Sequence, residues 1–147
     1  MKKLFAITTL AVAATSASAL DFTVLAGRSF GDTHVNDVGL TVSQSAGPAT
    51  VGLGYNRAAG GDQNRFSLIG GYQVAKLGSV AVTPTVGLSY LHNKNTDNGM
   101  AVSAGVELSM PVYKKIEVVL DYSYQMGQKR VSQSDGNSLA LGVRMPF

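Results

Sequence analysis

Apolar and polar residues alternate with a period of two along most of this 147-residue chain. Such alternation is typical of β-strands, because successive side chains of a strand point to opposite faces. Stretches rich in Gly, Asn, Asp, Ser and Lys separate the alternating segments. The eight segments cover approximately residues 21–30, 35–43, 50–57, 65–74, 80–92, 100–112, 116–126 and 138–147. No segment after residue 19 keeps an apolar period of 3.6 residues, so we expect no helix there.

The connections between these segments alternate in length and polarity. The short ones cover residues 44–49, 75–79 and 113–115, whereas the longer, more polar ones cover 56–64, 92–98 and 127–137. The first connection, residues 31–34, is a modest exception. Ten membrane strands of about 9–11 residues would leave too few residues for the long loops. The pattern predicts an all-β fold, an eight-stranded antiparallel up-and-down transmembrane barrel with both termini at one end.

The two faces of the predicted strands differ in chemistry. One parity carries large apolar residues, such as Leu40, Leu53, Val102 and Leu120, and the other carries small, polar and charged ones. The aromatic residues cluster near the strand ends of the apolar parity, as in the two interfacial girdles of membrane barrels. A soluble barrel such as a lipocalin or streptavidin would concentrate them in mid-strand. The pattern therefore favours a membrane barrel over a soluble periplasmic one.

The first nineteen residues have the pattern of an export signal. Lys2 and Lys3 precede a short apolar run over residues 4–14, and Ala17-Ser18-Ala19 fits a cleavage site. Eleven apolar residues are too few for a membrane helix, which needs about 20. We expect cleavage after Ala19, so that residues 1–19 are a signal peptide and residues 20–147 form the barrel. Because the sequence contains no cysteine, we expect neither a disulfide nor a lipoprotein anchor.

The last segment ends on an aromatic residue after a regular apolar stripe. The stripe consists of Leu139, Leu141, Val143, Met145 and Phe147. This ending resembles the final strand of bacterial outer-membrane barrels, which the barrel-assembly machinery recognises. Over residues 20–147 the architecture resembles the small eight-stranded outer-membrane barrels, such as the transmembrane domain of outer membrane protein A and the outer membrane protein X/Ail adhesins.

That resemblance implies a location, an orientation and partners. It implies the bacterial outer membrane, with the N- and C-termini on the periplasmic side and the longer loops outside. The implied partners are outer-membrane lipid, lipopolysaccharide and the assembly machinery, and the implied state is a monomer. Two of the twelve basic residues, Lys2 and Lys3, belong to the predicted signal peptide, so the rest of the chain is nearly neutral. Nothing in this balance indicates a nucleic-acid partner.

Five charged residues fall on the inward parity of the predicted strands. They are Arg65, Glu107, Glu117, Asp121 and Arg144. Hairpin geometry predicts that Glu107 lies near Asp121 and that Arg144 reaches Glu117 or Asp121. An eight-stranded barrel is just wide enough inside for side chains to fill it, and buried charges there must pair. The sequence predicts an ion-pair cluster in the lower and middle barrel, with an ion- or proton-conducting path as the alternative.

Candidate chemistry elsewhere is sparse. His34 and His92 fall in predicted outer loops without a positioned nucleophile, and no His/Asp cluster has metal-ligand spacing. We expect no enzyme activity, cofactor or metal. Lys129-Arg130 is a compact basic pair that fits lipopolysaccharide phosphates or an anionic host surface, although a solvated loop pair is the preferred interpretation. The predicted function is a structural or surface-interaction barrel. A narrow pore for small solutes or ions is the alternative, and a lipid-modifying barrel enzyme ranks low.

Two residues depart from the strand pattern. Arg28 lies on the apolar parity of the first segment, and we expect it near the outer interface, where its stem can extend toward water. Pro84 lies inside the fifth segment, where the missing N–H removes a hydrogen bond between strands. We expect a bulge near the periplasmic end to accommodate it.

Overall fold

A computed structural model describes residues 20–31, 34–59, 63–93, 98–127 and 135–146. The predicted signal peptide, Lys129, Arg130 and Phe147 lie outside these residues. Within them, no helix is long and apolar enough to cross a membrane. The strands are β1 (Leu20–Gly31), β2 (Val35–Ala46), β3 (Ala49–Ala58), β4 (Gln63–Tyr72), β5 (Ala75–Leu77), β6 (Val80–Asn93), β7 (Gly99–Tyr113), β8 (Ile116–Gly127) and β9 (Gly136–Pro146).

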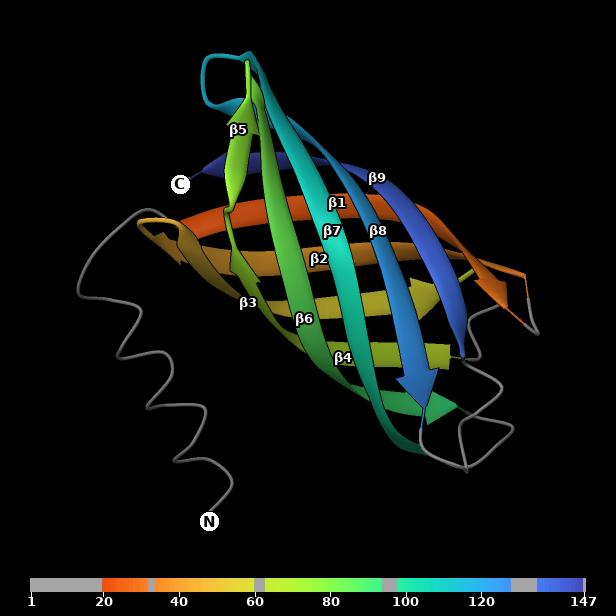
Figure 1. The fold of residues 1–147 in the computed structure, drawn as a ribbon. Coiled ribbons are helices and arrows are strands. Elements are labelled where there is room, and N and C mark those ends of the chain that lie inside the picture. Colours follow the sequence, from red (N-terminus) through yellow and green to blue (C-terminus); the bar gives the residue numbers. More distant parts are fainter. Residues whose placement is uncertain (1–19, 32–33, 60–62, 94–97, 128–134, 147) are drawn as a thin grey trace.

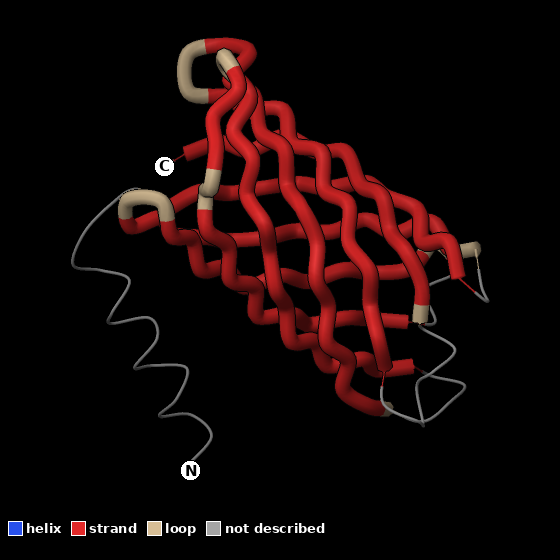
Figure 2. The backbone as a smooth tube through the Cα atoms, viewed as in Figure 1, coloured by secondary structure: helices blue, strands red, loops and turns tan. Residues whose placement is uncertain are grey.

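The strands form one closed antiparallel barrel (Figure 1). The sheet order is β4-β3-β2-β1-β9-β8-β7-β6-β5, and β4 also pairs with β6, which closes the sheet on itself. The first and last strands pair along their whole length, from Asp21↔Pro146 to Gly31↔Gly136. Strand β5 continues β4 after a short break, so the wall has eight strands (Figure 2). The predicted all-β, eight-stranded antiparallel barrel is confirmed.

The two ends of the barrel differ in the length of their connections. Two-residue turns at Gly47-Pro48, Gly78-Ser79 and Lys114-Lys115 join strands at one end, here called the turn end. The first residue of each turn has a positive φ of 62°, 64° and 47° respectively, which two glycines adopt without strain. The first and last described residues lie there too, because Leu20 pairs with Gln44, near the turn at Gly47-Pro48, and Pro146 pairs with Asp21. Figure 1 shows β1 beginning and β9 ending at this end of the barrel. The strand ends that flank the longer connections lie at the opposite end, here called the loop end.

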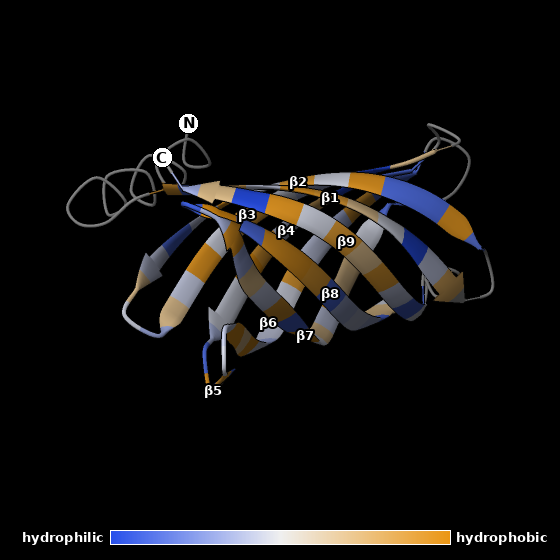
Figure 3. Ribbon diagram, turned by 90° about the horizontal axis from the view of Figure 1, so that it is seen from above, coloured by the Kyte–Doolittle hydropathy of each residue, from blue (hydrophilic) through white to orange (hydrophobic). Residues whose placement is uncertain are grey.

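Large apolar side chains point out of the barrel. Along the strands, orange apolar positions alternate with white and blue ones (Figure 3). Leu53 is 52% exposed and Leu141 is 58% exposed, whereas the buried apolar residues among those described are only Leu91, Ala101 and Val119. A soluble barrel would show the reverse distribution, with its apolar residues inside. The outward face instead has the chemistry that a lipid environment requires.

Pro84 is accommodated by an irregularity in the neighbouring strand. Pro84 keeps its regular pairing with Val106 of β7. On the other side, pairs Gly71↔Thr85 and Ala75↔Val82 enclose one more residue on β4–β5 than on β6. The Val82 carbonyl accepts a hydrogen bond from the Val74 N–H at 3.0 Å, so the backbone polar groups of Val82 point toward β4–β5. The backbone groups of every second residue point to the same side, so the nitrogen of Pro84, which has no hydrogen, faces the break between β4 and β5. The expected bulge therefore lies beside Pro84 rather than in its own strand.

Close approach of two strands requires glycine at position 142, and this predicts a mutational contrast. A Cβ on Gly142 would overlap the carbonyl oxygen of Val24 and lie 2.6 Å from Leu25 Cδ2, whereas a Cβ on Gly70 would meet only Val86 Cγ2 at 3.9 Å. Gly142→Ala should lower the free energy of unfolding by about 1–3 kcal/mol. Gly70→Ala should change it by less than about 0.5 kcal/mol. Urea unfolding in lipid vesicles measures both values, and equal effects would contradict the assigned contact.

Candidate functional site in the barrel lumen

Arg144 ties four strands together in the half of the lumen nearer the turn end. Its Nη2 donates to Glu107 Oε2 at 2.6 Å, and its Nη1 donates to Glu117 Oε2 at 3.5 Å. Its Nε donates to Thr23 Oγ1 at 3.2 Å, and Thr23 is fully buried. These partners come from β7, β8 and β1, while Arg144 itself lies on β9. Glu117 and Arg144 are direct neighbours in the register, whereas the bond to Glu107 passes across β8.

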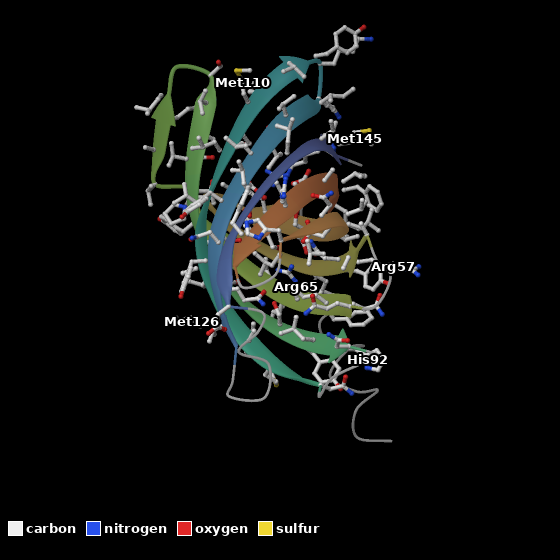
Figure 4. The ribbon with its side chains drawn as sticks, turned by 90° about the vertical axis from the view of Figure 1, so that its right-hand side faces the viewer. Arg57, Arg65, His92, Met110, Met126 and Met145 are labelled. Atoms are coloured by element: carbon white, nitrogen blue, oxygen red, sulfur yellow. The ribbon has the colours of Figure 1, made fainter. Side chains whose placement is uncertain are left out.

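A second charged group occupies the half nearer the loop end. Arg65 on β4 donates from Nη2 to Asp37 Oδ2 at 3.2 Å and from Nη1 to Gln125 Oε1 at 2.9 Å. Gln125 is buried, and the two charged side chains are 21% and 11% exposed. Figure 4 labels Arg65 among the side chains that point into the barrel. The group joins β2, β4 and β8, which are not neighbours in the sheet.

Asp37 is a further inward-facing carboxylate, beyond the five charged residues that were expected in the lumen. Asp37 shares its parity with Thr41 and Ser43, two residues placed on the inward face. From this parity, Asp37 could have been predicted to face the lumen. Its partner could not be predicted in the same way, because Arg65 lies two strands away in the sheet.

Asp121 faces the lumen between the two charged groups. Its direct neighbour on β7 is Glu107, as expected from the hairpin register. Arg144 forms its ion pairs with Glu107 and Glu117, and none with Asp121 among the described residues. Asp121 lines a cavity of about 100 Å³ together with Ser67, Ser103 and Ser123. Four of the five predicted residues thus lie on two separate levels of the lumen, Arg65 on one and Glu107, Glu117 and Arg144 on the other, and Asp121 lies between the two arginines.

Apolar and hydroxyl side chains fill other parts of the lumen. Leu91 and Ala101 form a small buried cluster near the loop end, and Val119 is fully buried on the side of the turn end. The hydroxyls of Ser67 and Ser89 lie 2.9 Å apart, as do those of Ser123 and Ser138. These buried apolar side chains were not expected, because the residues of the inward parity were predicted to be small, polar and charged.

At the turn end the lumen widens into a pocket of about 380 Å³. Arg144 and Glu117 line its inner part, and Lys76, Lys114 and Lys115 line its outer part. Within the described residues, no group of three or more His, Cys, Asp or Glu side chains is placed to hold a metal ion. The lumen therefore offers opposed charges and hydroxyls, arranged as two bonded layers with polar space between and below them.

The remaining candidate residues lie on the outer wall. Arg28 is exposed, and its guanidinium carbon lies 5.8 Å from the centre of the Phe30 ring, which His34 meets edge-on at 6.2 Å. In β9, Leu139, Leu141, Val143 and Met145 are all exposed on the outward face. Phe147 and the pair Lys129-Arg130 lie outside the described residues.

Comparison with known proteins gives matches in structure alone. No protein-family model matches the chain, and no curated protein matches it in sequence. Neisserial surface protein A is similar with a TM-score of 0.68 and 11% identity, over 88% of this chain and 96% of that one. A major outer membrane protein of Thermus thermophilus has a TM-score of 0.61 and 18% identity, over 88% and 100%.

The outer membrane protein Ail of Yersinia pestis, solved in a phospholipid bilayer nanodisc, is similar with a TM-score of 0.57. Its identity to this chain is 12%, over 89% of this chain and all of that one. At such identities the likeness concerns the fold. The expected resemblance is confirmed at that level: this chain has the fold of the small eight-stranded outer-membrane barrels.

Proposed function

We propose that this protein is a bacterial outer-membrane barrel with a structural or surface-interaction role, and that charged side chains close its lumen. The observation that carries the closure is the bonding of Arg144 to side chains of three other strands. Arg65 adds a second bonded layer nearer the loop end. The apolar outward face and the fold of outer-membrane barrels support the location.

The proposed orientation places the turn end in the periplasm. Outer-membrane barrels have short periplasmic turns and longer extracellular loops. The three two-residue turns and both described termini lie at one end of this barrel, which supports that orientation. The exposed stripe of Leu139, Leu141, Val143 and Met145 would then present an assembly signal, together with Phe147, to the barrel-assembly machinery.

The space left inside the barrel argues for closure over conduction. Between the two arginine layers the cavity measures about 100 Å³. An ion moving along the axis would have to break the short Arg144–Glu107 bond or the Arg65–Asp37 bond. A narrow pore for small solutes would require those layers to open.

Conductance in planar bilayers tests the closed lumen. The purified, folded protein should give no reproducible channel steps, because both bonded layers block the axis. Resolved steps in the wild type that change amplitude in Arg144→Ala or Glu107→Ala would overturn closure and establish the narrow pore. Arg57→Ala is the matched control, since Arg57 lies on the outer wall and its loss should leave the trace unchanged.

Lys129 and Arg130 remain part of the proposal as surface contacts. Their side chains fit lipopolysaccharide phosphates by charge. Replacing both with glutamine should weaken binding of whole cells or vesicles to an anionic surface if they serve that role.

A further inference from the structure

The outward face near the loop end carries two adjacent rows of side chains on three neighbouring strands. One row is aromatic, because Tyr55 pairs with Phe66 and Phe66 pairs with Tyr90. The next row toward the loop end is polar, and its members are Arg57, Asn64 and His92. Arg57 pairs with Asn64, and Asn64 pairs with His92, so the three lie side by side.

Direct contacts hold the two rows together. Tyr55 Oη donates to Asn64 Oδ1 at 2.9 Å, and the Tyr55 and Phe66 rings lie 5.0 Å apart. Because the Asn64 carbonyl accepts this bond, its amide nitrogen is left to donate toward the neighbouring space. Arg57 is exposed and points away from the barrel, and His92 lies on the outside of β6 at the same end (Figure 4). The polar row therefore presents several hydrogen-bond donors on one surface.

On the outer wall of the described strands, the fully charged side chains are all positive. In the described strands, every acidic side chain is on the inward parity: Asp21, Asp37, Glu107, Glu117 and Asp121. The outward strand residues with full positive charge are Arg28 and Arg57. With no carboxylate beside it on the outer wall of these strands, Arg57 attracts an anion from the surroundings. The planar guanidinium binds phosphate through two parallel hydrogen bonds.

The position of the row limits which anion it meets. Aromatic girdles of membrane barrels lie at the boundary between hydrocarbon and headgroups. A polar row one step beyond such a girdle lies at headgroup depth, where lipid phosphates are concentrated. The ligand is therefore an amphipathic molecule, with its phosphate against the polar row and its apolar part against the aromatic row.

We propose that Arg57, Asn64 and His92 form a binding site for a phosphate of the lipid A part of lipopolysaccharide, with Tyr55, Phe66 and Tyr90 contacting its apolar part. The choice of lipid A rests on the proposed function, which places the loop end in the outer leaflet. The site is separate from the lumen. It also assigns a role to His92, which was expected in an outer loop and instead lies on the outward face of β6.

Lipid retention by the folded protein tests this site. Native mass spectrometry would compare phosphorylated lipid A, dephosphorylated lipid A and phosphatidylglycerol on protein purified in detergent micelles. The wild type should hold phosphorylated lipid A about ten-fold more tightly than either other lipid. Arg57→Gln should remove most of that preference, and Arg57→Lys should retain part of it, because lysine keeps the charge and loses the paired donors.

Lys114→Gln is the matched control, since it removes the same charge at the opposite end. It should change binding of lipid A by less than about two-fold. Equal losses in Arg57→Gln and Lys114→Gln, or equal binding of dephosphorylated lipid A, would overturn the site. Equal binding of phosphatidylglycerol would overturn its assignment to lipid A. A conducting lumen would not alter lipid binding, so the lipid A site and the closure of the lumen are tested independently.

Discussion

Replacing Arg144 with alanine is expected to lower the free energy of unfolding by about 3–5 kcal/mol, the cost of breaking a buried ion pair from one side. The change removes both ion pairs and the hydrogen bond to Thr23. Glu107, whose side chain is 18% exposed, would be left as an unpaired carboxylate in the lumen. Glu117 is 34% exposed and can be hydrated more easily, so Glu107 should account for the larger part of the loss.

The variant must be measured in lipid vesicles with a probe that suits this chain. The protein has no tryptophan, so circular dichroism and the shift in gel mobility on heating replace tryptophan fluorescence. Arg57→Ala controls for loss of an arginine, because Arg57 is exposed on the outer wall, away from the lumen. It should cost less than about 0.5 kcal/mol.

A triple variant distinguishes two contributions to the loss of stability: the loss of the Arg144 hydrogen bonds, and the cost of leaving Glu107 and Glu117 without a partner. Arg144→Met combined with Glu107→Gln and Glu117→Gln removes both carboxylates that are ion-paired with Arg144. Replacing a whole buried ionic group with neutral residues is often close to neutral. The triple variant should therefore recover most of the stability that Arg144→Ala loses. A loss below about 1 kcal/mol in the single variant would mean that water already compensates these charges.

The strands and their faces could be predicted because a barrel wall repeats one simple rule. Alternation gave eight segments whose centres agree with the observed strands, and the observed bounds extend most of them by a few residues. The apolar stripe of β9 was assigned to the outward face, and Leu139, Leu141 and Val143 are exposed there. Period-two patterns carry this information because lipid and lumen demand opposite chemistry of neighbouring residues.

Contacts across the lumen could not be obtained in the same way. The register places Glu117 beside Arg144, but the short bond from Arg144 to Glu107 crosses β8. Arg65 reaches Asp37 and Gln125, which lie on strands that are not its neighbours. Such bonds depend on the curvature of the closed wall and on the reach of long side chains. A pattern along single strands contains neither quantity.

The apolar interior residues show a second limit of the pattern. Leu91 and Val119 have inward parity and almost no exposed surface, although most of their inward neighbours are small or polar. Where side chains fill the lumen completely, a well-packed apolar side chain occupies space without needing a partner. When faces are assigned from the average polarity of their residues, Leu91 and Val119 are exceptions. They are nevertheless needed, because their side chains fill space inside the barrel.

A charge at mid-height of the outer wall is expected to cost about 2–4 kcal/mol if the barrel spans a bilayer as proposed. Leu120 is the residue for this test, because it lies mid-strand in β8 and pairs with Leu108 and Leu141, both on the outward parity. Leu120→Arg should lower the free energy of unfolding by this amount in vesicles, since the guanidinium would enter the hydrocarbon region.

Met126→Arg supplies the control for depth on the same strand and face. Met126 is 51% exposed and lies one residue from the end of β8 at the loop end. Six residues of a strand that rises about 3.3 Å per residue and tilts by about 40° separate the two positions by roughly 15 Å along the membrane normal. An arginine there reaches the interface and should cost only about 0–1 kcal/mol.

The difference between the two variants is the informative quantity. Both replace an exposed apolar residue with arginine on β8, so strand propensity and loss of outward packing largely cancel. A larger cost for Leu120→Arg in vesicles reports depth in the hydrocarbon. Equal, small costs would contradict the placement of the outward face in lipid. A cost that stays large for Leu120→Arg but disappears at Met126 would place the loop-end boundary of the membrane between these residues, beside the aromatic row of Tyr55, Phe66 and Tyr90.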